Sequence, residues 1–170
     1  PDSTESGTAA VTETAQASES AEPAVTTEPP YDPRNEIAPG IKTNGQLVCE
    51  QNGHFRGISL YGGGYNRDKF VSVINEFSER LGEDIQTYVM IAPCSGEYYL
   101  PKNWSEYSAS QSEDIFYVAD NLSDKVISVD CVAALREHVN EEIYTRTDHH
   151  WQPLGAYYAA REFAAAAGID

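Results

Sequence analysis

The sequence is poor in positive charge and in long apolar runs. Eleven Lys and Arg residues stand against 27 Asp and Glu residues, which gives a net charge of −16. Such a surface repels phosphate backbones, so the composition argues against a nucleic-acid-binding protein and against adhesion to anionic membranes. No stretch of the sequence approaches the roughly 18 uninterrupted apolar residues of a membrane span.

Cysteine is scarce, and several catalytic motifs are missing. Cys49, Cys94 and Cys131 have no CxxC spacing, which indicates neither a zinc site nor a disulfide framework. We expect three buried thiols, with a single disulfide as the alternative. The chain has no G-x-S-x-G frame and no Gly-Asp-Ser, and its triple glycine at 62–64 lacks the Lys-Ser/Thr sequel of a phosphate loop.

The first 36 residues differ in composition from the rest. They are mainly Ser, Thr, Ala, Glu and Pro, with no aromatic residue before Tyr31. This composition buries too little apolar surface to offset the chain entropy lost on folding, so it predicts a disordered linker over residues 1–36. Such spacers follow lipid-anchored or membrane-tethered N-termini in exported bacterial proteins. We therefore expect an extracellular or cell-surface protein, with membrane contact only through a removed N-terminal anchor.

Local patterns predict strands and helices in the remaining domain, residues 37–170. Residues 47–50 and 55–60 flank Asn52-Gly53, a strong hairpin signal. Helical spacing of apolar residues runs from Asn66 to Gly82. Further strands are expected at residues 85–92 and 126–129, and further helices at residues 106–122, after Asp130 and from Pro153 to Gly168.

The alternation of strands and helices predicts an α/β fold with right-handed crossovers and a largely parallel sheet. The sequence stops at residues 168–170, directly after the last predicted helix. A further buried strand is expected at that point, so we expect the domain to be truncated at its C-terminus.

The densest group of titratable residues is Asp148, His149 and His150, in a loop before the last helix. In open α/β sheets ligand sites collect in such loops. Adjacent histidines on an extended segment cannot both point into one cleft, whereas Asp148 and His150 can share a side. An Asp that holds an imidazole is the supporting half of a nucleophilic triad. A capped turn with partly exposed histidines, or a metal site, remains an alternative.

The segment Thr147–Gly155 resembles the signature of the DHHW family of exported bacterial proteins. That family is similar to the alginate O-acetyltransferase group within the SGNH-hydrolase-like superfamily. The resemblance rests on Asp148, His150, Trp151 and Gly155, and on the upstream MIAPCSGEYYLP. It covers residues 44–170 and implies an SGNH-like three-layer α/β/α domain with a mostly parallel sheet.

The resemblance also implies a Ser-His-Asp triad. In that triad Asp148 orients His150, which acts as general base and then as general acid, while His149 has no catalytic role. We expect Trp151 to shape the site. Tyr98 and Tyr99 are candidates to stack on a sugar ring, and a simple cover of the sheet is their alternative role.

The nucleophile is the part of the triad that these residues do not supply. In the resembled group it lies in a Gly-Asp-Ser block after the acid–histidine segment, so we expect it beyond residue 170 and expect the present chain to be inactive alone. Ser95 and Ser59 are weaker internal candidates, and Cys94 is expected to be a structural thiol.

Three functions therefore compete. The first is a cell-envelope O-acetyltransferase or esterase that acts on a cell-surface polysaccharide or other glycan. The second is a non-catalytic glycan-binding or scaffold domain. The third takes Asp-His-His as manganese ligands of a phosphoesterase, but the chain lacks the D-x-D motifs that such enzymes need. We expect no cofactor and no bound metal.

Overall fold

The computed structural model describes residues 31–64 and 66–169. The first 30 residues of the predicted linker lie outside the described residues, and its last six include a short 3-10 helix. None of the described helices is both long and apolar enough to cross a membrane. The elements are, in chain order, η1 (Pro33–Asn35), β1 (Gly40–Thr43), β2 (Gln46–Gln51), β3 (His54–Ser59), α1 (Arg67–Leu81), β4 (Thr87–Met90), α2 (Gly96–Tyr99), η2 (Lys102–Tyr107), α3 (Gln111–Asn121), β5 (Val126–Val129), α4 (Cys131–Glu137) and α5 (Pro153–Ala167).

The first three strands form an antiparallel sheet in the order β1-β2-β3. Two Asn-Gly turns close its hairpins, and Asn44 and Asn52 have positive φ angles of 47° and 48°. Such turns match the twist of antiparallel strands. The predicted β2–β3 hairpin is confirmed, with Glu50 opposite Phe55. Strand β1 and its turn at Asn44 were not predicted from the sequence.

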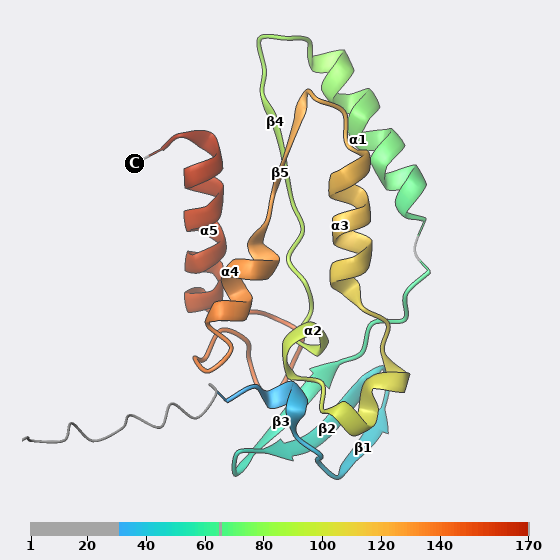
Figure 1. Cartoon of the computed structure of the whole chain (residues 1–170), viewed down its shortest axis with the longest axis vertical. Helices are drawn as coiled ribbons and strands as arrows, with labels where there is room; N and C mark the ends of the chain where they lie inside the picture. The colour runs from blue at the N-terminus through green and yellow to red at the C-terminus, as the bar shows by residue number, and fades with distance from the viewer. Residues whose placement is uncertain (1–30, 65, 170) are drawn as a thin grey trace, which may run out of the picture. The chain divides into compact units, whose positions relative to one another are not determined.

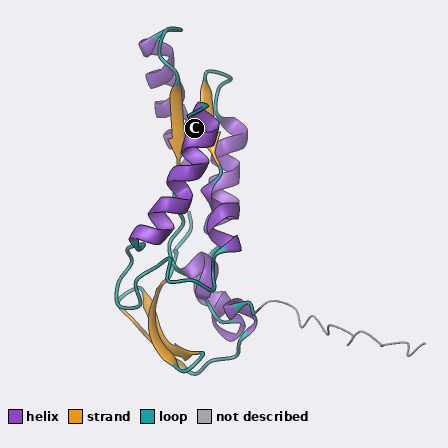
Figure 2. Ribbon diagram, turned by 90° about the vertical axis from the view of Figure 1, so that its left-hand side faces the viewer, coloured by secondary structure: helices purple, strands orange, loops and turns teal. Residues whose placement is uncertain are grey.

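The second sheet contains β4 and β5, which run parallel and have α3 between them in the sequence. Helix α1 packs against α3, while α5 packs against α4 and β5. Figure 1 shows β4 and β5 between two helix pairs, α1 with α3 and α4 with α5. In Figure 2 the antiparallel sheet lies at one end of the described unit, and the parallel strands and longer helices extend toward the other end.

The predicted fold class is wrong. The expected SGNH-like three-layer α/β/α arrangement with a mostly parallel sheet is replaced by a three-stranded antiparallel sheet and a separate two-stranded parallel sheet. Hairpin turns after β1 and β2 force antiparallel pairing there. The extended residues near Tyr144 form only an isolated bridge to Trp151 and do not join β4 and β5.

Three buried tyrosines join the parts of the core. The ring centroids of Tyr98, Tyr99 and Tyr144 lie 5.8–6.4 Å from one another. The Tyr98 hydroxyl donates to the carbonyl of Val132 at 3.1 Å, and the Tyr144 hydroxyl donates to the carbonyl of Pro93. Burial raises the pKa of Tyr98 and of Tyr144. Both hydroxyls therefore stay protonated and link α4, the segment after β4 and the loop before α5.

A buried carboxylate fastens three helices together. Glu97 on α2 accepts hydrogen bonds from the backbone amides of Gln111 and Ser112, the first two residues of α3. It also pairs with Arg136 on α4 at 2.9 Å. A carboxylate satisfies the unpaired amides of a helix N-terminus and the positive end of its dipole. Glu97 therefore holds the start of α3 beside α2 and α4.

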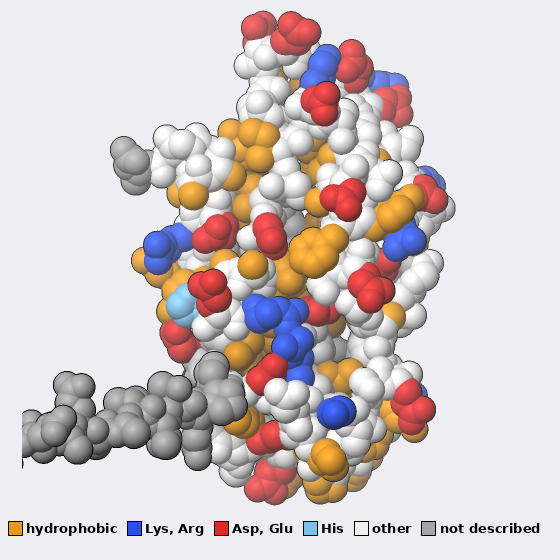
Figure 3. Space-filling view, in the orientation of Figure 1, with side chains coloured by type: hydrophobic (Ala, Val, Ile, Leu, Met, Phe, Trp, Pro, Cys, Tyr) orange, Lys and Arg blue, Asp and Glu red, His pale blue; other side chains and the backbone are white. Residues whose placement is uncertain are grey.

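The surface carries the charge expected from the composition. In Figure 3 acidic side chains are spread over the face that is shown, and hydrophobic side chains lie exposed among the helices.

The three cysteines are free thiols, as expected, although Cys94 is only half-buried. Burial raises the pKa of Cys49 and of Cys131 to about 11.

Gly155, in the first turn of α5, lets the helix approach the preceding chain closely. A Cβ atom at this position would lie 2.5 Å from the carbonyl oxygen of Ile143, a backbone atom that cannot move freely. Replacement of a helical glycine by alanine ordinarily stabilises a protein by about 0.5–1 kcal/mol. Because of the close approach to Ile143, we expect alanine at position 155 to destabilise the protein instead.

We predict that Gly155→Ala lowers the free energy of unfolding by about 1–3 kcal/mol, the usual cost of overpacking. Urea denaturation of the wild type and the variant measures the difference. Gly62→Ala is the matched control, because a Cβ there meets nothing within 4 Å, and it should change stability by less than about 0.5 kcal/mol. An unchanged midpoint for Gly155→Ala would contradict the close contact.

Candidate active site

The candidate site lies on the loop 145–150, whose two ends are paired. Tyr144 and Trp151 form an antiparallel bridge, and the Thr145 amide donates to the carbonyl of His150 at 3.0 Å. One residue further out, the Gln152 amide donates to the carbonyl of Ile143 at 2.9 Å. The loop is therefore closed immediately before the start of α5.

Asp148 and His150 lie on the same side of this loop, as predicted. The Nδ1 atom of His150 lies 3.1 Å from Oδ1 of Asp148, and the backbone amide of His150 donates to the same oxygen at 2.7 Å. Thr145 Oγ1 lies 2.6 Å from that oxygen, a shorter distance than to either of its two backbone acceptors. Since a hydroxyl has one proton, the shortest contact is the one it makes best.

These hydrogen bonds keep Asp148 ionised. They lower its pKa from 3.8 to about 2, and the largest cause is the hydrogen bond from Thr145, followed by the backbone amide of His150. An ionised Asp148 accepts a hydrogen bond from the N–H at Nδ1 of His150, so the tautomer with the lone pair on Nε2 is favoured. No described residue forms a hydrogen bond with that Nε2 atom.

The side chain of His149 lies on the same side of the loop as that of His150, unlike the arrangement expected for an extended segment. Its ring packs against that of His150, with centroids 4.0 Å apart, and both rings line one cavity. The prediction assumed an extended segment, in which adjacent side chains point to opposite sides. Residues 146–149 bend instead, which brings the two neighbouring rings to the same face.

A cavity of about 290 Å³ lies beside the two histidines. Its lining comes from the segment after β4, from the start of α3 and from the loop: Ala92, Pro93, Cys94, Gln111, Tyr144, His149, His150 and Trp151. Trp151 is half-buried and shares this cavity with His150. The volume is at the lower end of the range for small-ligand pockets.

None of the described residues that line this cavity is a serine. Ser95 is fully buried and its Oγ accepts a hydrogen bond from the Ser59 amide at 3.0 Å, while Ser59 Oγ is itself buried. Cys94 lines the cavity, but burial raises the pKa of its thiol and its Sγ donates to the carbonyl of Ser59 at 3.4 Å. Cys94 is therefore a poor nucleophile at neutral pH.

The two candidate sugar-stacking tyrosines lie away from His150. Tyr98 has no exposed surface and belongs to the core, so it has no ring face to offer a ligand. Tyr99 is also buried, but it borders a different pocket, formed with the β2–β3 hairpin. The structure therefore brings Asp148, His150 and Trp151 together and separates both tyrosines from them.

Thr145 and Gln111 contribute to the site, although neither was predicted from the sequence to do so. A threonine three residues before an aspartate is a local signal for a side-chain hydrogen bond, and the sequence contains that signal. Gln111 Oε1 accepts from the Cys94 amide at 2.6 Å across a long sequence separation, for which no local pattern exists. Among residues 31–64 and 66–169, no three His, Cys, Asp or Glu side chains are placed to share a metal ion.

A family model described as "DHHW protein" matches residues 60–170, which include the whole loop and α5. The chain belongs to the DHHW family. A crystal structure of a DHHW family protein from Eubacterium siraeum is 48% identical, with a TM-score of 0.74 over 78% of this chain and 44% of that one. The comparison with curated proteins finds no match.

Two structures of Bacillus cereus PatB1 also resemble this DHHW chain. One, with a sulfonyl adduct, is 20% identical with a TM-score of 0.58, and the other is 18% identical with a TM-score of 0.50. Each match covers 78% of this chain and 45% or 43% of PatB1. At this identity the likeness concerns the fold alone. The chain spans less than half the length of each of these three solved structures.

We predict that Thr145→Val raises the pKa of Asp148 from about 2 towards 3.8, because it removes the largest cause of the lowered value. A carbon-detected NMR pH titration of the Asp148 carboxyl group measures the change. Because folding lowers this pKa, the carboxylate stabilises the loop above pH 3.8, and the effect is lost as the pH falls through about 2. The exposed Thr43 supplies the control variant Thr43→Val, which should leave the Asp148 titration unchanged.

Proposed function

We propose that this DHHW-family chain is part of a cell-surface O-acetyltransferase or esterase with a Ser-His-Asp triad. The observation that carries the proposal is the 3.1 Å contact between His150 Nδ1 and Asp148 Oδ1, on a loop that also borders a cavity. An aspartate that holds one imidazole nitrogen leaves the other free to accept a proton from a nucleophile.

In the proposed reaction, His150 Nε2 takes the proton of a serine hydroxyl as the serine oxygen attacks the carbonyl carbon of an acyl donor. The imidazolium then gives this proton to the departing oxygen, and an acyl-serine remains. A sugar hydroxyl, or water, next loses its proton to His150 and attacks the acyl-serine. The new ester or free acid departs, and the serine regains its proton. Asp148 stabilises the imidazolium in both halves.

The serine comes, in this proposal, from a segment outside these 170 residues. Two observations support that source: none of the described cavity-lining residues is a serine, and the chain covers 44% of its 48% identical neighbour. Large apolar side chains on α1 are also exposed, among them Phe70, Val73 and Phe77. Exposed apolar patches of this kind are typical of surfaces that another part of a protein covers.

The acceptor and the location are proposed on chemical grounds. A cell-surface glycan supplies hydroxyl acceptors, and the half-buried Trp151 beside His150 supplies an aromatic wall suited to a sugar ring. The composition of residues 1–36 favours an exported protein, with membrane contact only through a removed N-terminal anchor.

The second candidate is a non-catalytic glycan-binding or scaffold domain. The absence of a serine from the described cavity lining favours it, because the cavity and Trp151 would then act in binding alone. The two functions differ in whether the longer protein holds an activated serine.

We predict that the longer natural protein containing this chain reacts with a serine-directed fluorophosphonate, and that the 170-residue chain does not. His150→Ala in the longer protein should reduce labelling and acyl release on the order of 10^3-fold or more, because the triad works as a unit. His149→Ala is the matched control and should keep most of the activity. Gel fluorescence and an ester-hydrolysis assay provide the two measurements.

Three results would contradict the proposal in different ways. Equal or greater loss with His149→Ala would remove His150 from the role of base. Absence of labelling in the longer protein would favour the binding or scaffold domain. Labelling of the 170-residue chain would point to a serine within it and against one supplied from outside.

A further inference from the structure

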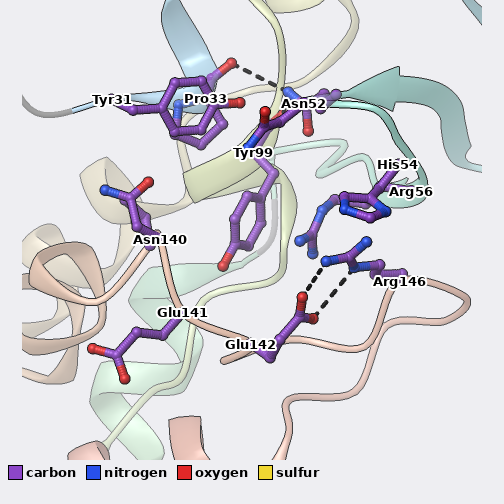
Figure 4. Close-up of a pocket in the computed structure, with 12 residues that line it drawn as sticks. Tyr31, Pro33, Asn52, His54, Arg56, Tyr99, Asn140, Glu141, Glu142 and Arg146 are labelled. Carbon is purple, nitrogen blue, oxygen red and sulfur yellow. Dashed lines mark hydrogen bonds and ion pairs between the residues drawn. The ribbon is translucent and has the colours of Figure 1, made fainter.

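A second pocket, separate from the cavity at His150, lies beside the β2–β3 hairpin. Its volume is about 310 Å³, and it shares no lining residue with the first cavity. Figure 4 shows its wall, which comes from residues near η1, the β2–β3 hairpin and the chain between α4 and the site loop. The lining side chains that matter here are Gln51, Arg56, Tyr99, Glu141, Glu142 and Arg146.

Three buried polar atoms on this wall lack a partner. Among the described residues, none forms a hydrogen bond with Arg56 Nη1, the Tyr99 hydroxyl or Gln51 Oε1. Gln51 and Tyr99 are only 6% and 2% exposed. In Figure 4 the Tyr99 hydroxyl and the Arg56 guanidinium both point into the space between the lining segments. Buried polar groups are normally satisfied, so three such atoms at one pocket indicate a bound partner.

Arg56 is the cation of this pocket that forms no ion pair with a described residue, although the carboxylate of Glu142 acts on its charge from a greater distance. Arg146 is paired with Glu142, while Glu141 lies 2.6 Å from His138 and accepts a hydrogen bond from Tyr158. The guanidinium of Arg56 instead lies over the Tyr99 ring, 3.9 Å from its centroid. Burial lowers the pKa of Arg56, and a bound anion would offset that cost.

We infer that this pocket binds a small hydroxycarboxylate, held by Arg56 and Tyr99. One unpaired guanidinium matches one carboxylate, and a doubly charged phosphate would meet the nearby carboxylates of Glu141 and Glu142. Burial raises the pKa of Tyr99 to about 12, so its hydroxyl keeps its proton and donates to the ligand. Gln51 Oε1 accepts from the ligand hydroxyl. This inference does not depend on the proposed acyl transfer.

The first test is an amide-detected NMR titration of the protein with lactate, with lactamide as the uncharged probe of the same shape. We expect saturable shifts around Arg56 and Tyr99 with lactate, and at least about tenfold weaker binding of lactamide. Arg56→Gln should weaken lactate binding by about tenfold or more, the usual effect of losing a charge-assisted hydrogen bond. Arg80→Gln, on the exposed face of α1, is the control and should leave binding unchanged.

Tyr99→Phe provides a second variant that tests the pocket without removing a charge. It deletes only a hydroxyl that has no described partner, so the variant should fold with unchanged stability and bind lactate about three- to tenfold more weakly. Equal binding of lactate and lactamide, tighter binding of inorganic phosphate than of lactate, or full affinity in both Arg56→Gln and Tyr99→Phe would each overturn the inference.

Discussion

The candidate site depends on the pairing that closes the loop between Tyr144 and Trp151. The His150 side chain is 67% exposed and that of Asp148 is 48% exposed, so neither is held in place by burial. Their geometry comes from the backbone bridge at the ends of the loop and from the Thr145 hydroxyl inside it. Tyr144 connects this bridge to the core, where its hydroxyl binds the carbonyl of Pro93. The exposed acid–histidine pair is thus positioned by a loop whose ends are paired and connected to the core.

Two members of the tyrosine cluster, Tyr144 and Tyr99, border two separate pockets that differ in their chemistry. Tyr144 borders the cavity with His149, His150 and Trp151, beside the hydrogen-bonded Asp148–His150 pair. Tyr99 borders the second pocket, whose wall has an unpaired guanidinium. The rings of the two tyrosines lie 6.2 Å apart, so a single packed core supports both walls. A protein with a net charge of −16 nevertheless provides a local positive group at one of them.

Local signals predicted the elements better than their arrangement. The α1 helix begins at the cap Asn66 and ends at Gly82, and α4 begins at the cap Asp130, because side-chain capping is decided by neighbours in sequence. The parallel pairing of β4 with β5 also agrees with the strand–helix–strand pattern. The sheet architecture could not be predicted from local signals, because strand pairing joins residues that are distant in sequence. The Asn-Gly turn at Asn44, which connects β1 to β2, was also not predicted.

The sequence by itself determined the Asp-x-His pair, the acidic surface and the resemblance to the DHHW family, because each depends on residue identity or on spacing of a few positions. The tertiary structure decided that the sheets are mainly antiparallel, that His149 lies beside His150, and that Tyr98 is buried. It also decided that Nη1 of Arg56 is buried without a hydrogen-bond partner among the described residues. Burial and partner choice depend on chain segments far apart in sequence, which only the folded packing brings together.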